Sequence, residues 1–163
     1  MPECRLNTAI MSSVMRRKKI NFDAVSGFFL ARSYWAGARL KEIIRKSIET
    51  SLCYGVYTDG KQVGFARVVT DYATMYWLCD VFMETGHRGV GVGKKLIETI
   101  VNAEELRGLT GILGTRDAHG LYQQYGFIKD GDRFMSGPRR WVRSKSGINE
   151  APGRFRKRRR CKR

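Results

Sequence analysis

The residue types best suited to chemistry lie in one glycine-rich segment, Arg88-Gly89-Val90-Gly91-Val92-Gly93-Lys94. Closely spaced glycines let backbone N–H groups converge on an anion, and a helix that starts there adds the partial positive charge of its N-terminus. Arg88 and Lys94 add full positive charges. The segment therefore predicts a loop that holds a phosphate or pyrophosphate, and a glycine-rich turn without a ligand is the alternative.

Two common phosphate-binding motifs do not fit this loop. A Walker loop requires glycine where Arg88 stands and Ser or Thr where Lys95 stands. A dinucleotide-binding fingerprint requires glycine where this chain has Lys94 or Leu96. The loop is therefore expected to bind a phosphate-bearing ligand of another class.

The elements that precede the loop are predicted from hydrophobic periodicity. Helical spacing begins at Asn21, a suitable N-cap, and a second helical pattern follows Gly37. Alternation then predicts a hairpin with strands over 52–57 and 62–70, joined by a turn at Asp59-Gly60, and a third strand over 75–83. The loop thus follows three consecutive, mostly antiparallel strands.

The segment after the loop contains further helices and strands in alternation. A helix is predicted first, with Leu96, Ile97, Ile100 and Val101 on its inner face, and then a strand over 109–115. A short helix over about 117–125 should end at Gly126, which can adopt the left-handed C-terminal conformation. Closing strands are expected at Phe127 and around Phe134.

Two motifs follow one another in the chain: R-x-x-G-x-G, with Arg88, Gly91 and Gly93, and A-x-x-L-Y-x-x-x-G-F, from Ala118 to Phe127. Together, in this order, they resemble the GNAT superfamily of acetyl-CoA-dependent N-acetyltransferases. The resemblance covers roughly residues 22–136 and extends to the order of the elements. It implies a mixed α/β (α+β) fold in which helices flank a central, mostly antiparallel, twisted sheet.

The resemblance also implies a co-substrate, acetyl-CoA. Backbone groups near Phe82 and Met83 would pair with its pantetheine arm. The segment from Arg88 to Lys94 would bind the pyrophosphate, with the residues Arg88, Gly89, Val90, Gly91, Val92, Gly93 and Lys94. An amine would then attack the thioester directly, without an acyl-enzyme.

Three side chains are candidates for proton transfer in that reaction. Tyr122 matches the family tyrosine that protonates the thiolate, and a phenol with a pKa of about 10 can donate to a thiol with a pKa of about 8.5. Packing of an amphipathic helix is its alternative role. Asp80, inside an apolar run, and Glu84, just beyond it, are candidate bases, although Asp80 could equally form a structural ion pair and Glu84 could be simply an exposed residue. A chain of water molecules is the third option.

No metal site is expected. His119 and His87 are the two histidines, and neither belongs to a cluster of ligand types. The six aromatic residues that could line an acceptor pocket are Tyr34, Trp35, Phe65, Tyr72, Tyr76 and Trp77. Core packing explains most of these aromatic residues equally well.

The charge of the chain is concentrated at one end. Of 31 basic and 15 acidic residues, twelve basic residues and one acid, Glu150, lie between Arg139 and Arg163, so the remainder carries nineteen basic and fourteen acidic residues, a net charge of +5. We therefore expect a loose leader over 1–19, one acetyltransferase-like domain over 20–143 and a basic, disordered tail over 144–163. The tail would attract polyanions weakly and without specificity.

Other function classes stay open at this stage. A nucleic-acid-binding module or an acyl-CoA-binding regulator on an inactive fold of this kind would carry the same motifs. Four cysteines without a C-x-x-C pair, no membrane-length apolar run and no signal-peptide pattern favour a soluble, cytoplasmic protein without a membrane partner. The acceptor, a small molecule or a protein, could be a polyamine, an amino acid, an antibiotic or a protein lysine, and a homodimer would leave no mark in the sequence.

Overall fold

The computed structural model describes residues 15–16, 20–33, 39–131 and 133–135. The chain divides into two compact units, residues 1–129 and 130–163. In the second unit, Asp130 and Arg133 form an exposed ion pair of 3.3 Å. Most of the predicted leader, the predicted boundary at residue 143 and the basic tail lie outside the described residues, so these remain predictions.

Two helices form one layer of the first unit. They are α1 (Phe22–Arg32) and α2 (Lys41–Glu49). The predicted N-cap is present, because the Asn21 side-chain oxygen accepts a hydrogen bond of 3.1 Å from the backbone N–H of Ala24. The proposed break at Gly37 lies outside the described residues, and α2 begins after the extended residue Leu40.

The described residues form a five-stranded sheet with the order β1-β2-β3-β4-β5. The strands are β1 (Met15–Arg16), β2 (Leu52–Thr58), β3 (Lys61–Thr70), β4 (Met75–Met83) and β5 (Thr110–Leu113). All neighbouring pairs are antiparallel except β4 and β5, which are parallel. The predicted hairpin turn is present, since Asp59 and Gly60 both have positive φ angles, 50° and 75°, as a tight two-residue turn between strands requires.

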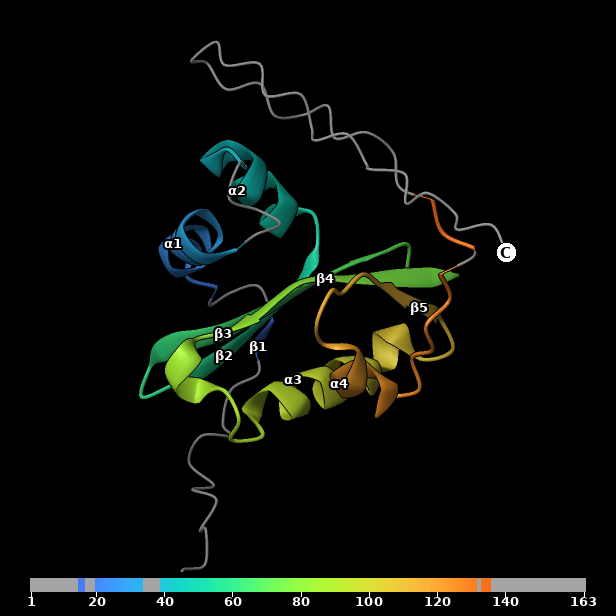
Figure 1. Ribbon diagram of the computed structural model, residues 1–163. Coiled ribbons are helices and arrows are strands. Elements are labelled where there is room, and N and C mark those ends of the chain that lie inside the picture. Colours follow the sequence, from blue (N-terminus) through green and yellow to red (C-terminus); the bar gives the residue numbers. More distant parts are fainter. Residues whose placement is uncertain (1–14, 17–19, 34–38, 132, 136–163) are drawn as a thin grey trace, which may run out of the picture. The chain divides into compact units, whose positions relative to one another are not determined.

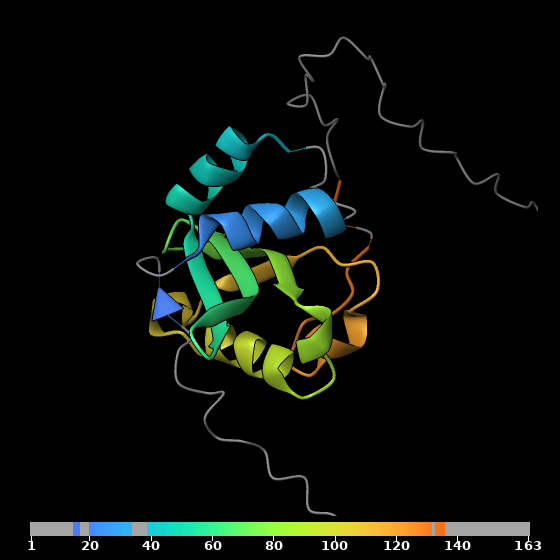
Figure 2. The same ribbon diagram turned by 90° about the vertical axis from the view of Figure 1, so that its left-hand side faces the viewer.

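Helices cover both faces of this sheet. Helices α1 and α2 lie on one face, and α3 (Val92–Val101) and α4 (His119–Gln123) lie on the other (Figures 1 and 2). Two short 3₁₀ helices, η3 (Thr85–His87) and η4 (Glu104–Leu106), flank α3 in the chain. The predicted mixed fold with a mostly antiparallel sheet flanked by helices is therefore confirmed.

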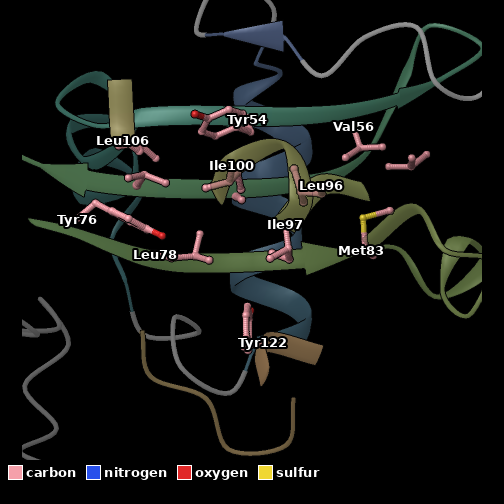
Figure 3. Close-up of a cluster of buried hydrophobic side chains, with 13 residues drawn as sticks. Tyr54, Val56, Tyr76, Leu78, Met83, Leu96, Ile97, Ile100, Leu106 and Tyr122 are labelled. Carbon is pink, nitrogen blue, oxygen red and sulfur yellow. The ribbon is translucent and has the colours of Figure 1, made fainter. Parts of the chain in front are cut away.

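Each face of the sheet has its own hydrophobic cluster. The α3 face carries the larger one, which includes Leu78, Met83, Ile97 and Tyr122 (Figure 3). The α1 face carries an aromatic one, in which the ring of Phe82 stacks on Phe28 with centroids 3.7 Å apart. Because a pleated strand directs alternate side chains to opposite faces, β2, β3 and β4 contribute to both clusters.

The closing strands predicted at Phe127 and around Phe134 are wrong for the part of the chain that the structure describes. Residues 124–131 and 133–135 form no strand. Gly126 (φ 82°) instead ends α4, and Phe127 N–H donates to Tyr122 O while Gly126 N–H donates to Gln123 O. This is a Schellman motif, and the ring of Phe127 makes its hydrophobic contact with Tyr122 at 6.1 Å between centroids. Phe127 thus belongs to a helix cap.

Neighbouring residues of α1 provide a test of the aromatic cluster. Phe29 is completely buried and contacts the rings of Phe28, Phe65 and Phe82, whereas the next residue, Leu30, is 40% exposed. We expect Phe29→Ala to lower the free energy of unfolding by about 3–5 kcal/mol, because it leaves a cavity. Leu30→Ala should cost less than about 1 kcal/mol. Equal costs in urea unfolding would contradict this description of the cluster.

Candidate active site

The candidate site is organised by a bulge in β4. Phe65 pairs with Phe82 and Arg67 pairs with Cys79, so Ala66 stands opposite two residues, Asp80 and Val81. Asp80 has φ 53°, in the left-handed region that residues other than glycine rarely adopt. The extra residue reverses the alternation of β4: Leu78 belongs to the α3-face cluster before the bulge, and Phe82 to the α1-face cluster after it.

Strands β4 and β5 stay paired only over their first residues. Their ladder runs from Met75 with Thr110 to Leu78 with Leu113. Strand β4 then continues through the bulge for the five residues Cys79–Met83, which lie beyond the last paired residue of the β5 ladder. In parallel sheets, ligands bind beyond the carboxyl ends of the strands. The end of this ladder is therefore the place to search for a ligand site.

The register determines which backbone groups of β4 face away from β3. Glu84 N–H donates to Val63 O at 2.8 Å, and in an antiparallel ladder every second residue points its N–H and C=O groups to the same neighbour. The backbone groups of Phe82 therefore point to β3, and those of Met83 point away from it. Of the two residues expected to pair with pantetheine, only Met83 has the required orientation, and its carbonyl oxygen accepts a hydrogen bond of 2.9 Å from Arg88 Nε.

The glycine loop joins β4 to α3 at the same end of the sheet. Gly89 (φ 77°) and Gly91 (φ 86°) both adopt the left-handed conformation, and Gly91 is the N-cap of α3. The space around both Cα atoms is open, because a Cβ built on either would meet nothing within 4 Å. No side chain caps the first turn of α3, so its N–H groups can bind an anion. These features fit a pyrophosphate.

The other predicted residues of the loop surround this helix start. Arg88, Val90 and Lys94 are exposed, and Val92 and Gly93 form the first turn of α3. The bond from Arg88 Nε to Met83 O orients the guanidinium group and leaves its terminal N–H groups for a ligand. The structure thus gathers the whole predicted segment, Arg88 to Lys94, around one helix N-terminus.

Helix α4 is held beside this helix start. The Tyr125 hydroxyl donates a hydrogen bond of 2.8 Å to the carbonyl oxygen of Lys94, and Thr115 Oγ1 accepts one of 3.1 Å from Ala118 N–H where α4 begins. Tyr122, on the same short helix, is 8% exposed and lies in the α3-face cluster with Leu78 and Ile97 (Figure 3). Tyr122 therefore belongs to the same buried cluster as residues of β4 and of α3, the helix that follows the glycine loop.

Among the described residues, Asp80 forms ion pairs with two arginines. Its Oδ2 atom lies 2.8 Å from Arg39 Nη1 and 2.8 Å from Arg67 Nε, and Arg67 Nη1 donates to Ser51 Oγ at 3.0 Å. Burial by itself would raise the pKa of Asp80, but the hydrogen bonds and charges of the two arginines outweigh it and lower the pKa. A carboxylate held in this way is a weak base, which supports the structural role for Asp80 over the catalytic one.

Glu84, the second candidate base, is half-buried just after β4. It precedes η3, and its carbonyl oxygen accepts a hydrogen bond of 2.9 Å from His87 N–H.

Across the described residues, no group of three or more His, Cys, Asp or Glu side chains could hold a metal ion. Over the same residues, no helix has the length and apolar character needed to cross a membrane.

Sequence reasoning did not find Arg39 and Arg67, the partners of Asp80. The signal was present, since Arg67 is a charged residue in an otherwise alternating strand and Asp80 is the acid in an apolar run.

Among the aromatic residues that could line an acceptor pocket, Tyr34 and Trp35 lie outside the described residues. Phe65 and Tyr76 are core residues, while Tyr72 and Trp77 are exposed by 59% and 46%.

Comparison with known proteins identifies the family. A family model described as an acetyltransferase (GNAT) domain matches residues 49–129. A solved protein of Xanthomonas campestris pv. campestris, assigned to the GNAT acetyltransferases, is 36% identical with a TM-score of 0.69, over 74% of this chain and 87% of that one. The chain therefore belongs to the GNAT acetyltransferase family, whose members generally transfer acetyl groups from acetyl-CoA.

Two further relatives are more distant. A protein of Gibberella zeae that is named as an acetyltransferase is 25% identical over 88 residues, and the match covers 43% of this chain and 50% of that protein. The chain thus spans about half the length of this curated relative. A Clostridium acetobutylicum protein solved with acetyl-CoA shares the fold, with a TM-score of 0.55 at 15% identity over 76% of this chain and 95% of that one.

The ion pairs of Asp80 predict a pH-dependent contribution to stability. Asp80→Asn keeps a residue that tolerates the left-handed conformation but removes the charge, and it should lower the free energy of unfolding at pH 7 by about 3 kcal/mol or more. Because folding lowers the pKa of Asp80, this difference should be constant between about pH 5 and 7, and it should shrink as the pH falls below the unfolded value of about 4.

Urea unfolding of both proteins across this pH range measures the difference. The control is Asp59→Asn, an exposed residue that also has a positive φ angle. It should change stability by less than about 0.5 kcal/mol at every pH. A difference for Asp80→Asn that stays constant or grows below pH 4 would show that the ion pairs do not hold the carboxylate.

Proposed function

We propose that this protein transfers an acetyl group from acetyl-CoA to a primary amine by direct attack of the amine on the thioester. The glycine loop carries the proposal, because two left-handed glycines, an uncapped helix start and two exposed cationic side chains meet where the β4–β5 ladder ends. Such a site is suited to an anion, and a phosphate or pyrophosphate fits it. Family membership supports acetyl transfer as the general chemistry.

In this proposal the chain binds and orients its co-substrate from two elements. The segment Arg88–Lys94 holds the pyrophosphate with backbone N–H groups and the charges of Arg88 and Lys94. The backbone of Met83, which points away from β3, is the candidate partner for the amide groups of the pantetheine arm, and Phe82 supports this strand through its ring stack. Acetyl-CoA supplies the thioester carbonyl that the amine attacks.

Proton transfer completes the proposed reaction. The amine nitrogen forms a bond to the carbonyl carbon, the carbon–sulfur bond breaks, and Tyr122 donates its phenolic proton to the departing thiolate. Burial of Tyr122 in the α3-face cluster, with its ring against Phe127, supports this role, because a polar contact is stronger in apolar surroundings. The proton that the amine loses passes to Glu84 or to water, since Asp80 is already bound by two arginines.

Binding of acetyl-CoA is the first test. Calorimetric titration of the chain ended after Arg143, with ATP as a control, avoids the attraction of the basic tail for any polyphosphate. Selective micromolar binding is the expected result, and no binding would overturn the proposal.

Gly91→Ala should weaken binding at least tenfold, because φ 86° is strained for alanine by about 1–2 kcal/mol. Gly120→Ala, in α4 with open space around it, is the matched control.

Turnover distinguishes an enzyme from an acyl-CoA-binding regulator. Tyr122→Phe should lower kcat on the order of 100-fold while the affinity for acetyl-CoA stays within about twofold, because only the proton donor is lost. Release of free CoA in the presence of an amine measures kcat. Tyr57→Phe, which removes a hydroxyl from β2, should leave kcat unchanged. An unchanged kcat for Tyr122→Phe would remove the general acid from the mechanism.

A further inference from the structure

The charged cluster around Asp80 lies on the sheet face opposite the glycine loop. Arg67 follows Phe65 by two residues on β3, so its side chain shares the α1 face of the sheet with the aromatic cluster. Arg39 joins the same carboxylate from the segment that precedes α2. The cluster is therefore level with the bulge, where β4 and β5 cease to pair, but α3 and the glycine loop lie on the other face (Figure 2).

The ion pairs of this cluster join two positive charges to one negative charge. The two arginine side chains are 16% and 13% exposed, and the Asp80 side chain is 2% exposed, so the arginines are the more accessible members of the cluster. Cys79, which pairs with Arg67 across the strands, adds no charge, because burial raises the pKa of its thiol to about 12. In the part of the chain that the structure describes, the cluster carries a net charge of +1.

An uncovered apolar pair continues this face. Val69 and Trp77 are cross-strand partners two residues along from Arg67 and Cys79, so all four share one face. Val69 is 45% exposed and Trp77 is 46% exposed. A cationic cluster at the bulge thus lies next to an apolar surface on the open part of the sheet.

We propose that the acceptor amine carries a carboxylate, as in an amino acid, and that Arg39 and Arg67 bind that carboxylate. This inference rests on the proposed acetyl transfer, which requires the amine to reach the thioester from the face that the co-substrate leaves free. Guanidinium groups pair with carboxylates through two parallel hydrogen bonds. An apolar side chain on the same acceptor would contact Val69 and Trp77.

The charge of the cluster also discriminates among the amine classes. A net positive charge repels polyamines and other polycations, whereas a carboxylate beside the amine compensates it. The same charge lowers the pKa of a nearby amine and so favours the neutral form that attacks the thioester. An amino acid satisfies both conditions, and a polyamine satisfies only the second.

Matched acceptors test the inference on the full chain. The panel consists of the twenty amino acids, the carboxamide of each, spermidine and cadaverine, with release of CoA as the readout. At least one amino acid, with phenylalanine, tryptophan and leucine tested first, should have a kcat/KM at least tenfold above that of its carboxamide. Equal or better use of the carboxamide or of a polyamine, or no amino acid acetylated at all, would overturn the inference.

Variants of Arg39 test whether the charged cluster causes the preference for an amino acid over its carboxamide. Arg39→Gln should reduce the ratio of kcat/KM between the amino acid and its carboxamide to near one, mainly through KM of the amino acid. Arg39→Lys should restore part of the ratio, because it keeps the charge. Arg45→Gln is the control, since Arg45 is an exposed arginine of α2 that lies over the ring of Phe22. An unchanged ratio in Arg39→Gln would overturn the assignment.

Binding of acetyl-CoA distinguishes a failure of the proposed function from a failure of this inference. If wild-type protein does not bind acetyl-CoA, the proposed function fails and the inference fails with it. If it binds acetyl-CoA but uses carboxamides as well as carboxylates, only the inference fails. Calorimetric titration of acetyl-CoA into Arg39→Gln should match wild type within about twofold, which shows that the variant is folded.

Discussion

The left-handed residue Asp80 is the constraint on which the arrangement of this molecule depends. A residue other than glycine in this conformation costs on the order of 1–3 kcal/mol, and such strain persists only where the surrounding structure fixes it. Here the two ion pairs of the Asp80 side chain fix it. The bulge then brings Phe82 under α1 and Met83 toward α3, so both hydrophobic clusters require it. After the bulge, β4 continues past the last residue that pairs with β5.

The end of that ladder explains why residues far apart in sequence meet. Strands β4 and β5 are parallel, so their carboxyl ends point the same way, and the segments that follow both begin there. One segment is the glycine loop with α3, and the other leads to α4. The bond from Tyr125 to Lys94 joins them across 31 positions of the chain. A parallel pair inside an otherwise antiparallel sheet thus brings together the glycine loop and the helix that carries Tyr122, to which the proposed function assigns phosphate binding and proton donation.

The sequence predicted those elements whose signals are local. The N-cap at Asn21, the Asp59-Gly60 turn and the glycine loop each depend on a few adjacent residues, and all three are present. The bulge was not predictable from the sequence. The run from Met75 to Met83 is mostly apolar on both faces, so its hydrophobic pattern does not show that one residue is left unpaired. The partners of Asp80 were missed since Arg39 lies 41 positions away, and periodicity carries no information about such contacts. Phe127 was assigned to a strand because a helix cap and a strand end can both place an aromatic residue after glycine.

The electrostatics of the two sheet faces fit one reaction. On the α3 face, the glycine loop, Arg88 and Lys94 offer positive charge to an anionic co-substrate, and on the α1 face the cluster of Arg39, Arg67 and Asp80 is also positive overall. In the proposed reaction, these charges favour the neutral, nucleophilic form of the amine, so its deprotonation does not require a strong base of the protein. Under the proposed mechanism this accounts for a carboxylate at the bulge that is bound by two arginines: Asp80 fixes the conformation of the strand, and the positive net charge of the three residues favours the neutral amine.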